Sequence, residues 1–134
     1  MLTHMRTASC SCGQLKVRCA GEPIRISICH CLACQKRTGS AFGIQARWPS
    51  DRVTIEGQAQ QYARTGDEGS TATFRFCSTC GATVYWDNDG MPGTIAVAVG
   101  AFADPTFPPP RVSVYGVRRH PWIVMPSLTI EELD

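Results

Sequence analysis

The sequence predicts a mainly β fold with one short helix. Short segments in which apolar and polar residues alternate recur along the chain, and glycine- or proline-containing breaks separate them. Only residues 31–38 combine helix-forming side chains with a stop signal. The 134 residues suffice for one domain with a hydrophobic core, and we expect this domain to span 1–134 with its core at about 8–122.

Eight segments have the pattern of a β-strand. In the second of them, 24–29, isoleucine occupies every other position, as expected for a strand with one buried face. The last of them, 94–99, is more apolar and suits a central strand. The predicted strands are 14–19, 24–29, 42–48, 52–56, 60–64, 71–77, 83–86 and 94–99.

The predicted helix contains two cysteines, Cys31 and Cys34. They are three residues apart and so lie on one face of it, where amides at the helix start would lower their thiol pKa values. Gly39 follows Thr38 as the stop signal. Lys36 and Arg37 either meet substrate carboxylates or are solvated. A C-terminal helical turn is expected at 127–133.

Composition and charge exclude several classes of protein. A chain that is 43% hydrophobic and 18% charged is neither disordered nor a coiled coil. Its longest apolar run, 95–103, is too short to cross a membrane. The net charge is only +2 and the arginines are scattered, which argues against a nucleic-acid partner. Because no basic-then-apolar leader precedes Cys10, we expect no secretory signal and a cytoplasmic location.

The eight cysteines carry the strongest functional signal. Seven of them occur in close groups, with one or two residues between neighbours. Disulfides are rare in a reducing compartment, whereas closely spaced cysteines let several sulfurs converge on one metal ion. The groups are Cys10 with Cys12, Cys29 with Cys31 and Cys34, and Cys77 with Cys80.

The first and last groups together predict a structural zinc site. Each ends in Cys-Gly, and glycine permits the tight turn that points backbone amides at sulfur. Four thiolates complete a tetrahedral shell, and an ion held by them ties two distant parts of the chain together. The predicted ligands are Cys10, Cys12, Cys77 and Cys80.

The middle group predicts a catalytic zinc site. Cys29, Cys31 and Cys34 supply three ligands, and a catalytic zinc keeps its fourth position for an exchangeable ligand. A redox pair among these cysteines is an alternative. Cys19 is a further candidate ligand, although a lone cysteine in a strand is more often a small buried side chain. His30 alternates with Cys29 and Cys31, so we expect it to point away from the metal.

Three cysteine motifs and their order along the chain resemble the glutathione-dependent formaldehyde-activating enzyme (Gfa) family. That family shares its domain with centromere protein V. The likeness runs from about Cys10 to about Trp122. The motifs are Cys10-Ser11-Cys12-Gly13, then Cys29-His30-Cys31-x-x-Cys34 with Thr38-Gly39-Ser40-Ala41-Phe42, then Phe76-Cys77-x-x-Cys80-Gly81.

The resemblance implies an Mss4-like fold, also called a β-tent, with two zinc ions per chain. It also implies a carbon–sulfur lyase of the S-(hydroxymethyl)glutathione synthase type, which acts on a thiol–aldehyde adduct such as S-hydroxymethylglutathione. Carried over by position, the structural-zinc ligands are Cys10, Cys12, Cys77 and Cys80, and the catalytic-zinc ligands are Cys29, Cys31 and Cys34.

The expected partner is a small-molecule thiol or thiol adduct, glutathione among them. Zinc at an open site lowers the pKa of a bound thiol or hemithioacetal oxygen. Two other functions stay open: a non-enzymatic two-zinc binding module, as the relation to centromere protein V allows, and a thiol redox enzyme like the methionine sulfoxide reductases of related fold. A fourth protein ligand at the middle cluster favours the module, and reactive metal-free cysteines favour redox chemistry.

Overall fold

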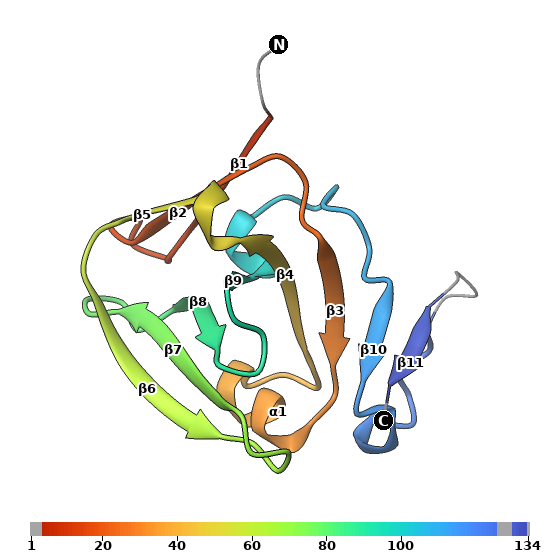
Figure 1. The fold of residues 1–134 in the computed structure, drawn as a ribbon. Coiled ribbons are helices and arrows are strands. Elements are labelled where there is room, and N and C mark those ends of the chain that lie inside the picture. The colour runs from red at the N-terminus through yellow and green to blue at the C-terminus, as the bar shows by residue number, and fades with distance from the viewer. Residues whose placement is uncertain (1–3, 126–129, 134) are drawn as a thin grey trace.

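Two β-sheets and a short α-helix make up the described part of the chain. The computed structural model describes residues 4–125 and 130–133 (Figure 1). A small sheet has the strand order β1-β2-β5, and a large sheet has the order β11-β10-β3-β4-β9-β8-β7-β6. The strands are β1 (Met5–Ser9), β2 (Lys16–Ala20), β3 (Arg25–Cys29), β4 (Gly43–Pro49), β5 (Val53–Glu56), β6 (Ala59–Thr65), β7 (Thr71–Cys77), β8 (Thr83–Asn88), β9 (Thr94–Ala98), β10 (Val112–Val114) and β11 (Glu131–Leu133).

The helix α1 (Leu32–Thr38) connects β3 to β4, and three 3-10 turns connect other strands. Figure 1 shows the small sheet at one end of the large sheet and α1 at the opposite end. The predicted fold class, a mainly β Mss4-like (β-tent) fold with one short helix near the middle cysteines, is confirmed. No helix in the described ranges has the length and apolar character needed to cross a membrane. The 3-10 turns are η1 (Ser50–Arg52), η2 (Val99–Phe102) and η3 (Gly116–Arg118).

The main hydrophobic core joins the small sheet to one face of the large sheet. Leu15, Val17 and Cys19, in and beside β2, are fully buried against residues of the large sheet. Trp48 on β4 is the largest fully buried side chain, and its indole Nε1 donates to the carbonyl of Gly21 at 3.0 Å. This bond satisfies the polar atom that a buried tryptophan carries into the core.

The other face of the large sheet is also partly buried. Strand side chains alternate between faces, so Trp48 points into the main core while Arg47 points to the opposite side. On that side Phe74 packs against Trp86 at a ring separation of 5.2 Å in a second, smaller core. Four of the five residues of β3 are buried, on both faces of the strand, although its isoleucine alternation predicts only one buried face.

Four elements differ from the sequence-based prediction. Residues 131–133 form strand β11 rather than a helical turn, because they pair in parallel with β10; the rest of that predicted turn, 127–129, lies outside the described residues. Strands β1 and β10 were not predicted, since each is short and gains its stability from pairing with a neighbouring strand. The helix begins at Leu32, with Cys31 as its N-cap.

Candidate metal centres and the adjoining pocket

Four cysteines from two separate turns converge beside the small sheet. Cys10 and Cys12 lie in the turn after β1, whereas Cys77 is the last residue of β7 and Cys80 lies in the turn that follows it. Their four sulfur atoms all lie within 4.8 Å of one another. The first turn is closed by a hydrogen bond from the Cys10 amide to the Leu15 carbonyl at 3.0 Å. The cluster therefore joins two hairpins that are far apart in the sequence.

Each of these turns needs a glycine. Gly13 and Gly81 have φ angles of +85° and +80°, in the left-handed region that other residues rarely adopt. The second turn is closed by the amides of Cys77 and Gly81, which donate to Ala82 and Cys77 carbonyls respectively, both at 3.0 Å. Glycine follows the second cysteine of each pair because the turn requires a positive φ at that position.

The spacing of the four sulfurs fits a tetrahedral metal ion. A metal–sulfur bond of about 2.3 Å places two ligands of a tetrahedral shell about 3.8 Å apart. The Sγ of Cys12 lies 3.6 Å from the Sγ of Cys10 and 3.6 Å from that of Cys77. All the cysteines are free rather than disulfide-bonded. This group of soft ligands can hold a metal ion.

Three hydrogen-bond donors point at the sulfur of Cys77. The Gln14 side chain donates to the Sγ of Cys77 at 2.9 Å, and the amides of Thr79 and Cys80 donate to the same atom at 3.3 Å. Desolvation raises the pKa of Cys77, but these hydrogen bonds outweigh it and lower the pKa to about 5. These donors thus favour the thiolate form of Cys77, which is the form that binds a metal.

A second group of three cysteines lies at the junction of β3 and α1. Cys29 is the last residue of β3, Cys31 is the N-cap of the helix, and Cys34 lies in its first turn. Their three sulfurs are within 4.8 Å of one another. The Cys34 amide donates to the Sγ of Cys31 at 3.3 Å. The helix ends as predicted, with Gly39 in the left-handed conformation at φ +65° and its amide bonded to the Gln35 carbonyl.

The three thiols behave as one electrostatic unit. Hydrogen bonds from Cys29 and Cys34 lower the pKa of Cys31, whereas hydrogen bonding to Cys31 and Cys34, together with burial, raises the pKa of Cys29. The ionisation of each of these thiols therefore depends on the other two. Within residues 4–125 and 130–133, no histidine, aspartate, glutamate or further cysteine joins this group. Three sulfurs leave one position of a tetrahedral shell for a ligand from outside the group.

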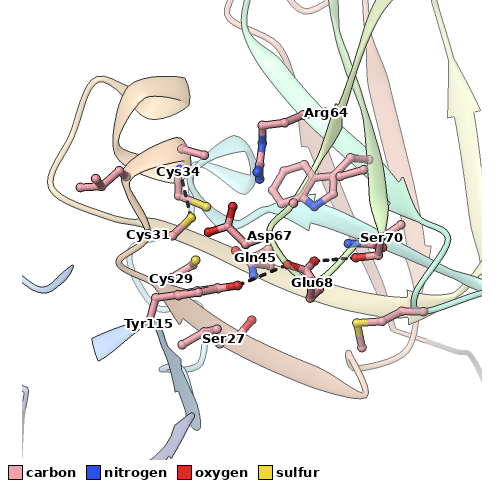
Figure 2. Close-up of a pocket in the computed structure, with 18 of the residues that line it drawn as sticks. Ser27, Cys29, Cys31, Cys34, Gln45, Arg64, Asp67, Glu68, Ser70 and Tyr115 are labelled. Atoms are coloured by element: carbon pink, nitrogen blue, oxygen red, sulfur yellow. Dashed lines mark hydrogen bonds between the residues drawn. The ribbon is translucent and has the colours of Figure 1, made fainter. Parts of the chain in front are cut away.

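This three-cysteine cluster faces a large cavity. The cavity has a volume of about 620 Å³ and extends over the face of β3 and β4 that points away from the main core. Figure 2 shows Cys29, Cys31 and Cys34 on one wall, with Asp67 and Glu68 opposite them. Such a volume suits a small-molecule ligand. The four-cysteine cluster does not line this cavity. It also does not line a second, smaller pocket bordered by α1, β6 and β7.

Tyr115 lies in the same cavity in a strained conformation. Its φ of +55° is uncommon for a large side chain. The strain is maintained by its amide, which donates to the Leu133 carbonyl at 2.8 Å, and by its hydroxyl, which donates to Glu68 at 3.3 Å. Glu68 in turn accepts from Ser70 at 2.6 Å, as Figure 2 shows. Burial and the charge of Glu68 raise the pKa of Tyr115, so its hydroxyl keeps its proton.

The remaining candidates from the sequence lie outside both clusters. His30 is fully buried, packs edge-on against Phe42, and belongs to neither group of sulfurs. Burial lowers its pKa, so it is neutral. Cys19 lies in the main core, where burial raises its pKa to about 12. Both residues therefore serve in packing rather than as members of a metal-ligand group.

Other pocket residues could not be identified from the sequence. Tyr115, Asp67 and Glu68 belong to loops far from the cysteines in the chain, and only the fold brings them together. The positive φ of Tyr115 has no sequence signature. Arg37 was a candidate for contact with substrate, but its guanidinium stacks on Trp86 at 4.4 Å from the ring centre.

The chain is similar to a known protein family and to a solved structure. The chain matches the family described as glutathione-dependent formaldehyde-activating enzyme over residues 5–118. A solved structure of a Rhodobacter sphaeroides protein has a similar fold, with a TM-score of 0.57 and 20% sequence identity over 77% of this chain and 91% of that chain. Such a distant likeness supports the fold alone. The family match covers both cysteine clusters and Tyr115, and the chain therefore belongs to the glutathione-dependent formaldehyde-activating enzymes, a family of lyase type.

Proposed function

We propose that this protein is a zinc-dependent carbon–sulfur lyase acting on a thiol–aldehyde adduct such as S-hydroxymethylglutathione. The observation that carries the proposal is the three-cysteine cluster facing a cavity of about 620 Å³. Three thiolates with one open position are typical of catalytic zinc, whereas four thiolates are typical of structural zinc. Family membership supports the reaction class. We further place the enzyme in the cytoplasm, where its thiols stay reduced.

The two clusters have different roles in this proposal. Cys10, Cys12, Cys77 and Cys80 hold a structural zinc ion, and Cys29, Cys31 and Cys34 hold a catalytic one. Bound zinc supplies Lewis acidity, which keeps a coordinated substrate thiol ionised at neutral pH. The three cysteines would hold that ion where it faces the cavity.

The proposed reaction forms or breaks one carbon–sulfur bond. In the direction of adduct formation, the substrate thiolate attacks the formaldehyde carbon, a C–S bond forms, and the carbonyl π electrons move to oxygen. That oxygen then takes up one proton and becomes the hydroxyl of the adduct. In reverse, the hydroxyl loses its proton, the C–S bond breaks, and thiolate and formaldehyde are released. No oxidant or reductant is needed in either direction.

Tyr115 is the residue we assign to the oxygen of the adduct. Its hydroxyl lies in the cavity and bonds to Glu68 at 3.3 Å. A protonated hydroxyl held in this way can donate a hydrogen bond to an oxygen that gains negative charge during addition. Glu68 positions Tyr115 and accepts its hydrogen bond when no substrate is present.

Metal analysis combined with a turnover assay tests this proposal. We expect two zinc ions per chain, an average of about 3.5 sulfur ligands by X-ray absorption, and consumption of formaldehyde that depends on glutathione. Two zinc ions that each have four protein ligands, with no turnover, would support a binding module instead. Metal-free protein that undergoes reversible thiol oxidation would support a redox enzyme.

A further inference from the structure

Two arginines stand opposite each other on the floor of the cavity. Arg25 on β3 is the register partner of Arg47 on β4, and both line the cavity. Like charges directly opposite one another in an antiparallel pair destabilise a sheet. This pair of cations therefore needs a compensating anion.

No carboxylate in the described part of the chain supplies that anion. None of the ion pairs formed by residues 4–125 and 130–133 includes Arg25 or Arg47. The Nε of Arg25 and the Nη1 of Arg47 are buried and have no hydrogen-bond partner among those residues. Arg47 is only 6% exposed. Burial, followed by the charge of Arg25, lowers the pKa of Arg47, which reflects the cost of an uncompensated buried cation.

The arginine pair lies at a defined distance from the three sulfurs. Arg25 and Cys29 are on the same face of β3 and four residues apart, which is about 13 Å along a strand. Between them, Ser27 is paired in register with Gln45. The side-chain oxygen of Gln45 is likewise buried and has no hydrogen-bond partner among the described residues. Polar residues therefore continue along the cavity floor from the cysteines to Arg47.

We propose that Arg25 and Arg47 bind a carboxylate of the substrate whose sulfur lies at the three-cysteine cluster. The sulfur end of this inference rests on the function proposed above, whereas the carboxylate end rests on the arginine pair. A guanidinium group matches the two oxygens of a carboxylate, and two such groups bind one anion more strongly than either alone. One bound carboxylate would compensate both buried charges.

The opposite wall sets the length of the substrate. Asp67 and Glu68 face the three cysteines (Figure 2), so a carboxylate close to the substrate sulfur would be repelled. A carboxylate farther along the molecule instead reaches the arginines. Glutathione carries its thiol on the central residue and a carboxylate at each end, so each carboxylate lies several ångströms from the sulfur, and the long arginine side chains cover the rest of the distance of about 13 Å along β3. We therefore expect peptide-sized thiols to bind and mercaptoacetate to be rejected.

Calorimetric binding to the zinc-loaded protein tests the carboxylate site without requiring turnover. S-methylglutathione is the probe, because it keeps both carboxylates but cannot form a thiolate. We expect Arg47→Met to weaken its binding about 10- to 100-fold and Arg47→Lys to restore part of the loss. The matched control is Arg111→Met, because Arg111 is exposed and lies outside the cavity. S-methylglutathione diethyl ester, which lacks both carboxylates, should bind all four proteins weakly.

The outcomes separate this inference from the proposed function. Equal affinity of the wild type and Arg47→Met for S-methylglutathione, or no binding by the wild type, would overturn the carboxylate site even if turnover occurs. Arginine-dependent binding without turnover would support the carboxylate site and contradict the lyase. Arg47→Met should melt no lower than the wild type, because it removes an unpaired buried charge. For a variant that fails to fold, Arg25→Met gives the same test at a less buried position.

Discussion

The two cysteine clusters differ in solvent exposure, but exposure alone does not indicate which of them is suited to bind a substrate. In the four-cysteine cluster Cys12 and Cys80 are exposed, whereas in the three-cysteine cluster Cys29 and Cys34 are buried. Yet the four-cysteine cluster has a complete set of sulfurs for a tetrahedral ion, whereas the three-cysteine cluster faces a cavity with only three. The number of ligands and the space in front of them therefore distinguish a structural centre from a reactive one. Substitutions in and around the two clusters test this distinction.

The largest effect is expected from Cys77→Ser, which removes a ligand from the closed cluster. A structural zinc contributes about 10–16 kcal/mol of apparent binding free energy, which is comparable to the whole stability of a domain, about 5–15 kcal/mol. Because this cluster joins the turns after β1 and β7, we expect the variant to be unfolded or to melt far below the wild type. Circular dichroism on heating measures the melting temperature, and metal analysis of the same sample measures the zinc content.

A matched change on an exposed residue of the same turn controls for local disruption. Ser78→Ala alters a neighbouring side chain that is exposed and is not part of the cluster. It should keep both metal ions and melt close to the wild type. If Cys77→Ser were also folded and fully metal-loaded, the four-cysteine cluster would not be a structural centre.

Cys31→Ser should separate activity from stability. Loss of one of three sulfurs weakens the metal that activates the substrate, and we expect turnover to fall by about 1000-fold or more, equivalent to several kcal/mol. The four-cysteine cluster is untouched, so one zinc ion should remain and the melting temperature should change little. Glutathione-dependent formaldehyde consumption and zinc content of the same sample test both points. A variant with full activity would contradict the role of the three-cysteine cluster.

The strands were largely predictable because their stability comes from a periodic pattern. All eight predicted segments are strands, and 71–77 has the predicted bounds. β1 and β10 escaped prediction since pairing, rather than their own composition, forms them. The last strand, β11, has the sequence Glu-Glu-Leu, which favours a helix locally, but parallel pairing with β10 outweighs that preference.

The cysteine clusters were predictable for a different reason from the pocket around them. Close spacing brings sulfurs together through a single turn, so Cys29, Cys31 and Cys34 converge whatever the rest of the chain does. Tyr115 and Arg47 reach the same cavity only through strand order and register. Their roles depend on long-range pairing, for which local sequence holds no signal.

Tyr115→Phe should affect the open cluster less severely than loss of a sulfur. The change removes one hydrogen-bond donor but keeps the ring, and we expect kcat to fall about 100-fold with little change in KM. Tyr62→Phe is the control, because Tyr62 is exposed on β6 and does not line the larger cavity. Equal kcat values for the two variants would remove Tyr115 from the mechanism. Zinc content should match the wild type in both.

The smallest effect is expected at the cysteine that belongs to neither cluster. Cys19 is fully buried in the main core, and its pKa is raised to about 12 by burial, so it stays a neutral thiol. Cys19→Ala leaves a cavity the size of one sulfur atom and should cost about 1–2 kcal/mol of unfolding free energy. Both zinc ions and kcat should be unchanged, as denaturant unfolding and metal analysis would measure. Loss of a zinc ion or of kcat in a variant that stays folded would contradict the assignment of Cys19 to packing alone.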